Sequence, residues 1–294
     1  MKRVIVAAAG VSLLWGSGWL FIKLGVSSFP PFLFAGVRGV LAGLILLAAQ
    51  RWQGQRLPGR EQLLPMIGIG ILLTGVSNGF TFWGQQRISS SLAALTWCAM
   101  PFFTAIFSHF LIPGQRLNQW RVLGLLAGFS GVWLVLSTQH LDLGTGATAG
   151  KIAIICSALI WAFSLVMNKR LLPDANSTMM TGVQLLAGGL FLVPLGVLTE
   201  KTAAMQFSLI SVLDFLMMLF GQGIIAYLCY YYLLSKVSAT SVAMLSFVTP
   251  TIAVILGVLL LGETPYWQMG AGLMLVAVGI VTVNMIGQRE RVTT

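Results

Sequence analysis

Charge is scarce in this sequence. Only 8% of the 294 residues are Asp, Glu, Lys or Arg, and 57% are hydrophobic. The mean hydropathy is +0.91. A soluble protein of this size needs far more charge to cover its surface. The scarcity excludes a soluble globular protein and predicts a chain that lies in a membrane.

Acidic residues and histidines are rarer still. The 7 Asp and Glu residues and the 2 histidines are scattered along the chain. They predict no metal site and no clustered catalytic set. A glycine-rich loop of the nucleotide-binding type is also missing, which argues against an ATP-driven pump. We expect no cofactor and no enzymatic activity, with a membrane enzyme acting on lipid-linked substrates as a distant alternative.

The acids and cysteines near apolar segments have simple interpretations. Asp214 and Glu263 fall at segment ends, and no Asp or Glu lies at the middle of one. Because proton relays in membranes use buried ionisable groups, the sequence does not predict proton coupling. Cys98, Cys156 and Cys229 all lie inside apolar segments, so no disulfide framework is expected.

Long apolar runs take the place of charge. Stretches of about 17–25 residues recur along the chain, and this length suits membrane-spanning helices. We predict ten such helices, over residues 4–24, 31–50, 64–86, 90–112, 120–136, 151–170, 178–198, 209–234, 239–261 and 266–285. The connections are short and leave no room for a soluble domain. The predicted fold class is an all-α membrane protein.

The two halves of the sequence repeat one another. A nearly constant offset aligns Trp15 with Trp161, Lys23 with Lys169, Arg38 with Gln184, and Pro101 with Pro250. We therefore predict one repeat over residues 1–140 and a second over 146–294. Each holds five helices, an odd number, so the second enters the membrane from the opposite side. Inverted halves of this kind are typical of secondary transporters.

Positive charge is unevenly distributed over the two sides of the predicted bundle. The side of both termini carries Lys2, Arg3, Arg51, Arg56, Arg60, Arg116, Arg121, Lys169, Arg170, Lys236, Arg289 and Arg291. The other side carries Lys23, Arg87, Lys151 and Lys201. The excess predicts cytoplasmic termini in a bacterial-type inner (plasma) membrane. The net charge of +10 thus reflects topology, and we expect no nucleic-acid partner.

Several motifs resemble one family. The stretches LLWGSGWLFIK, LTWCAMPFFTAIF and LSFVTPTIAVILGVLLLGE are similar to the EamA-type ten-helix exporters of the drug/metabolite transporter superfamily. The resemblance implies export of metabolites or drugs through a cavity lined by helices 1, 3, 4, 6, 8 and 9, with helices 5 and 10 as scaffold. Glu263 matches the family's acidic position, whereas the first half carries Gln115 there.

Aromatic and polar residues gather on the helices that the resemblance assigns to the cavity. The candidate lining residues are Trp15, Trp19, Asn78, Phe82, Trp97, Trp161, Gln222, Tyr227, Tyr230 and Tyr231. Such a lining suits flat, partly apolar solutes, including cations through cation–π contact. The alternative is that these groups only hold neighbouring helices together.

The remaining candidates concern movement and charge. Pro101 and Pro250 each remove a helical hydrogen bond, and they predict either two hinges or two static kinks. Lys23 and Lys169 near helix ends predict capping, with a gate at each face as the alternative. Arg38 lies roughly 12 Å inside helix 2 by helix rise, and a structural role is favoured over a substrate contact.

The sequence therefore predicts a transporter that exports small metabolites by alternating access. Aromatic amino acids, or other aromatic compounds, are the favoured small-molecule substrates. Efflux of multiple drugs or organic cations is the alternative, because a cation–π chamber would serve it equally well. We expect a monomer surrounded by lipid, since its two halves already supply the pseudo-dimer.

Overall fold

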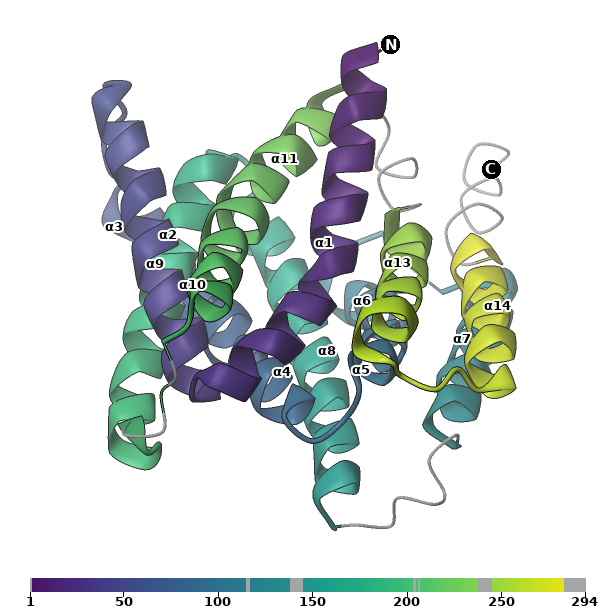
Figure 1. Ribbon diagram of the computed structural model, residues 1–294. Helices are drawn as coiled ribbons and strands as arrows, with labels where there is room; N and C mark the ends of the chain where they lie inside the picture. The colour runs from purple at the N-terminus through teal and green to yellow at the C-terminus, as the bar shows by residue number, and fades with distance from the viewer. Residues whose placement is uncertain are drawn as a thin grey trace.

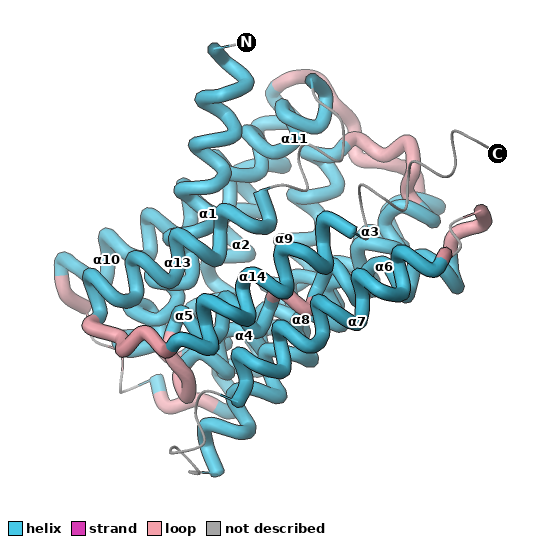
Figure 2. The backbone as a smooth tube through the Cα atoms, turned by 90° about the vertical axis from the view of Figure 1, so that its right-hand side faces the viewer, coloured by secondary structure: helices cyan, strands magenta, loops and turns pink. Residues whose placement is uncertain are grey.

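The computed structural model describes residues 2–114, 117–137, 145–202, 205, 207–236 and 245–282, without the side chains of residues 145, 231, 234, 235 and 245–247. Over these residues the chain is helical and contains no strand (Figure 2). Within this described part, eight helices are long and apolar enough to cross a membrane, and two shorter apolar helices follow them. The predicted all-α membrane fold is confirmed.

The first half contains five predicted spans. Its elements are α1 (Lys2–Ser28), α2 (Pro31–Trp52), α3 (Arg60–Gly70), η1 (Ile71–Ser77), α4 (Asn78–Gln85), α5 (Ser90–Trp97), α6 (Met100–Leu111) and α7 (Gln119–Leu136). The third span runs through α3, η1 and α4. The fourth span is interrupted between α5 and α6, where Cys98 and Ala99 form a turn.

The second half follows the same order. Its elements are α8 (Thr145–Leu171), α9 (Ser177–Thr199), α10 (Leu209–Leu216), η4 (Met217–Ile225), α11 (Ala226–Lys236), α13 (Leu245–Leu261) and α14 (Trp267–Val281). The eighth span runs through α10, η4 and α11. The first residues of the predicted ninth span and the last of the tenth lie outside the described residues.

Polar side chains fix where several spans begin. Ser89, Asn118 and Asn176 accept hydrogen bonds from backbone N–H groups in the first turns of α5, α7 and α9. Ser208 and Ser211 form a capping box at the start of α10. These groups satisfy donors that have no partner inside the helix. Short polar connections therefore set the register with which each apolar segment enters the bundle.

Glycines allow the corresponding helices of the two repeats to cross closely. At Gly189 on α9, a Cβ would lie 2.5 Å from a backbone nitrogen of α2. At Gly131 on α7, it would lie 2.6 Å from a backbone oxygen of α14. Small residues promote such contacts in membranes. Within one chain, α2 thus pairs with α9, and α7 pairs with α14 (Figures 1 and 2).

The start of α1 and the last described turn of α14 lie on the same side of the bundle, at the top of Figure 1. The turns between α4 and α5 and between α13 and α14 lie on the opposite side. We call these sides the inner face and the outer face. That the inner face is cytoplasmic stays a prediction from the distribution of Lys and Arg.

Candidate functional site

Aromatic side chains from three elements meet at the middle of α1. The ring of Trp15 lies 5.8 Å from Tyr227 and 5.1 Å from Tyr230 on α11. One turn later, the ring of Trp19 lies 5.8 Å from Trp97 at the end of α5. The spacing of four residues on α1 places both indoles on the same helix face.

Trp161 on α8 completes this group. Its ring lies 5.5 Å from that of Trp97, edge to face. We call the set of Trp15, Trp19, Trp97, Trp161, Tyr227 and Tyr230 the aromatic cluster. Its members are all half-buried, and they come from both repeats. The structure therefore brings together most of the aromatic residues that the sequence predicts to line a cavity.

The other predicted lining residues take different positions. Asn78 follows η1 and is half-buried. Phe82 is buried in an apolar core with Phe34 and Leu192. The Gln222 amide donates to the backbone oxygen of Leu14, which ties η4 to α1. The side chain of Tyr231 lies outside the described residues.

Two π-helical segments occupy corresponding places in the repeats. η1 interrupts the third span and η4 interrupts the eighth. Segments of this kind are rare and are frequent at functional sites. They precede Asn78 and contain Gln222, so both polar candidates lie where the helix is widened. The residue pattern gave no signal for this irregularity.

Lys23 closes the outer side of the site. Its ammonium donates to the backbone oxygens of Gln85 at 2.7 Å and Ile88 at 2.8 Å. Lys23 therefore caps the C-terminal end of α4, not of its own helix, where a cation is favoured. Lys169, its counterpart in the second repeat, is exposed in the last turn of α8.

Glu263 binds the same turn from the other side. Its carboxylate accepts from the backbone N–H groups of Ser90 at 2.7 Å and Ser91 at 3.0 Å, and from both hydroxyl groups. It also interacts electrostatically with Lys23. A carboxylate is favoured at a helix N-terminus, here that of α5. We call the contacts of Lys23 and Glu263 with residues 85–91 the outer seal.

Sequence reasoning missed a second carboxylate with a similar role. Glu200 after α9 accepts from the backbone N–H groups of Phe32 at 2.8 Å and Leu33 at 3.0 Å, and so caps α2. Both Glu263 and Glu200 follow one helix and cap the corresponding helix of the other repeat. A lone acid directly after an apolar span was the signal that could have found this role.

The two prolines differ in their surroundings. Pro101 lies in the first turn of α6, directly after the break at Cys98 and Ala99. Pro250 lies inside α13, which runs on past it. The fourth span therefore carries a discontinuity and the described part of the ninth does not. The hinge role of both residues stays a prediction.

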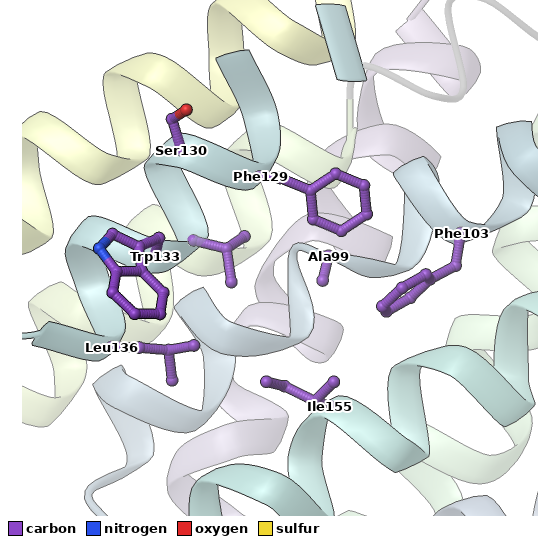
Figure 3. Close-up of a pocket in the computed structure, with 8 residues that line it drawn as sticks. Ala99, Phe103, Phe129, Ser130, Trp133, Leu136 and Ile155 are labelled. Atoms are coloured by element: carbon purple, nitrogen blue, oxygen red, sulfur yellow. The ribbon is translucent and has the colours of Figure 1, made fainter. Parts of the chain in front are cut away.

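Two cavities lie near the site without including the aromatic cluster. One of about 570 Å³ is lined by residues of α6, α7 and α8 and by Ala99 in the turn before α6, and its walls are mostly apolar (Figure 3). Trp133, on its rim, is 74% exposed, so this cavity opens on the lipid-facing side. The other, of about 490 Å³, lies at the outer face between the start of α2 and the end of α9.

The described residues contain no group of three or more His, Cys, Asp or Glu side chains that could hold a metal ion. His109 accepts a hydrogen bond at Nδ1 from the backbone N–H of Leu117, 3.2 Å away. This contact fastens the inner turn that follows α6. His140 lies outside the described residues.

Paired inverted halves and apolar spans are typical of a multi-pass membrane transporter, and the aromatic cluster draws residues from both halves. The model of the EamA-like transporter family matches residues 2–137 and 148–285. The chain belongs to this family, which confirms the resemblance read from its motifs.

Curated relatives agree with this class. The chain is 34% identical to the uncharacterized inner membrane transporter YedA of Escherichia coli strain K12, covering 92% of this chain and 88% of that protein. It is 24% identical to the uncharacterized transporter YoaV of Bacillus subtilis strain 168, covering 99% and 100%. It is 27% identical to the protein PecM of Dickeya dadantii strain 3937, covering 85% and 82%.

A solved crystal structure has the same fold. It matches with a TM-score of 0.72 and 20% sequence identity, covering 98% of this chain and 99% of that one. At this identity the likeness concerns the fold alone.

Proposed function

We propose that this transporter exports aromatic amino acids, or closely related small aromatic metabolites, by alternating access. The observation that carries this proposal is the aromatic cluster. Its rings lie near the middle of the spans, where Trp and Tyr are less favoured than at membrane interfaces. Half-buried rings in edge-to-face or tilted contact offer faces and edges to a flat solute.

The outer seal supports the proposal that transport proceeds by alternating access. Lys23 on α1 and Glu263 after α13 both bind the turn that joins α4 and α5. While these contacts hold, the outer ends of four spans stay together. Hydrogen bonds such as these can break and re-form, as a gate requires.

The inverted repeat suggests how the opposite state closes. Lys169 corresponds to Lys23 and is exposed near the inner face. The two lysines would then act in alternation, one at each face.

The test is flux of radiolabelled tryptophan and phenylalanine in proteoliposomes, with and without a proton gradient. We expect substrate-dependent flux that Trp161→Ala and Trp15→Ala reduce at least tenfold, because each truncation removes a large aromatic contact from the site. Trp52→Ala is the matched control, since Trp52 is 89% exposed at the end of α2.

Each outcome has a distinct meaning. Equal rates with and without the proton gradient would indicate a uniporter. Absence of flux for both amino acids would overturn the proposed substrate class. Flux of tetraphenylphosphonium in the same vesicles, lost on Trp161→Ala, would then favour efflux of organic cations.

A further inference from the structure

Two opposite charges are buried beside the aromatic cluster. Arg38 on α2 is 9% exposed, and Asp214 on α10 is 4% exposed. The guanidinium lies over the ring of Phe82, 5.3 Å from its centre. It lies within electrostatic range of the Asp214 carboxylate and of the Tyr227 side chain. Because Tyr227 also contacts Trp15, the charged pair borders the aromatic cluster.

Three buried polar atoms of this pair lack a hydrogen-bond partner among the described residues. Arg38 Nε and both carboxylate oxygens of Asp214 make no hydrogen bond within the described part of the chain. An arginine and a carboxylate buried together normally form a direct bidentate pair. A charge buried without such a partner costs several kcal/mol. Both side chains can therefore still bind a polar group from outside the described chain.

The corresponding place in the second repeat is different. Gln184 takes the position of Arg38, and its amide nitrogen donates to Asn168 Oδ1 at 2.7 Å. Its backbone oxygen accepts from the Thr74 hydroxyl. In the described part of the chain, no buried side-chain atom of Gln184 or Asn168 lacks a hydrogen-bond partner. The unpartnered atom is therefore specific to Arg38, because the equivalent position in the second repeat has its hydrogen bonds within the protein.

We propose that Arg38 and Asp214 bind the head group of a zwitterionic α-amino acid. The substrate carboxylate would pair with Arg38 and the ammonium with Asp214, while the side chain lies against Trp15, Tyr227 and Tyr230. Each buried charge then gains a partner, and the net charge of the site stays zero. An organic cation would satisfy Asp214 alone and leave Arg38 unpaired. This site deepens the proposed function and rests on it.

The experiment measures binding to the purified full-length protein in nanodiscs by calorimetry. The probes are phenylalanine, phenethylamine, which lacks the carboxylate, and 3-phenylpropionate, which lacks the ammonium. For the wild type we expect phenylalanine to bind about 10- to 100-fold more tightly than either analogue. The reason is that each analogue loses the charged hydrogen bonds of one end of the head group.

The variants separate the two ends of the head group. Arg38→Gln places the residue of the second repeat in the first. It should weaken the binding of phenylalanine about 10- to 100-fold and leave the binding of phenethylamine unchanged. Asp214→Asn should weaken the binding of phenylalanine by a similar factor and leave the binding of 3-phenylpropionate unchanged. The control is Arg51→Gln, which removes an exposed cation from the last turn of α2. It should leave the binding of all three probes unchanged.

A purely structural ion pair predicts another pattern. Each single variant would then lower the unfolding temperature, and the neutral double variant Arg38→Gln with Asp214→Asn would recover both stability and phenylalanine binding. Recovery of binding would overturn the head-group site. Equal binding of all three probes by the wild type would also overturn it and leave the proposed function intact. Binding of none of the probes would overturn both.

Discussion

Replacing Glu263 by Gln should open the outer face. The carboxylate accepts hydrogen bonds from two backbone N–H groups and two hydroxyl groups of Ser90 and Ser91. A glutamine keeps one acceptor oxygen and loses the charge that faces the N-terminus of α5. At about 1 kcal/mol for each of two lost bonds in this half-buried place, and about 0.5 kcal/mol for the helix dipole, the outer seal weakens by about 2–3 kcal/mol.

A change of this size corresponds to about 30- to 150-fold in the equilibrium between closed and open outer faces. Spin labels at the exposed positions Gln86 and Tyr266 would report it, in a background where the three cysteines are replaced. Pulsed dipolar spectroscopy should show a second, longer distance in Glu263→Gln. The control is Glu61→Gln, which removes an exposed acid at the inner face.

The wild type and the control should share one dominant short distance. An unchanged distance distribution in Glu263→Gln would refute the idea that this carboxylate closes the outer face. Its hydrogen bonds would then serve only to start α5. A lower unfolding temperature with unchanged distances would identify that simpler role.

Three further predictions concern packing and movement. Gly189→Val places a side chain where even a Cβ comes within 2.5 Å of the α2 backbone; thermal unfolding should show a loss of at least about 3 kcal/mol or no folded protein, and a wild-type unfolding temperature would contradict the close crossing. Pro101→Ala restores a backbone donor at the break in the fourth span; flux should fall several-fold while the unfolding temperature stays equal or rises, and unchanged flux would favour a static kink. Ser157→Ala removes the partner of the Ser77 and Thr81 hydroxyl groups, 2.9 and 2.6 Å away; it should cost about 0.5–2 kcal/mol in thermal unfolding, and a neutral effect would mean that these hydroxyls find other acceptors.

The position of Arg38 shows how far an internal repeat guides the interpretation of a single residue. The alignment with Gln184 favoured a structural role, since the other half works without the charge. Among the described residues, the Gln184 amide donates to Asn168, whereas the buried Arg38 Nε has no hydrogen-bond partner. Equivalent backbone positions can thus carry different tasks, because neighbouring side chains need not follow the symmetry.

The sequence by itself determined the fold class, most of the spans and the duplicated layout. The physical reason is that hydrocarbon tolerates only long apolar helices, so composition and length suffice to find them. The repeat could be read because aligned residues such as Trp15 and Trp161 keep their spacing. The aromatic cluster followed in large part from the same spacing.

Tertiary structure alone decided which polar groups meet. No local pattern pairs Lys23 with the end of α4, or Glu263 with the start of α5, since each contact joins residues far apart in the chain. The same holds for Phe82, which the sequence assigns to the cavity and the fold buries in a core. Periodicity predicts which face of a helix a residue occupies, but only tertiary packing determines what that face contacts.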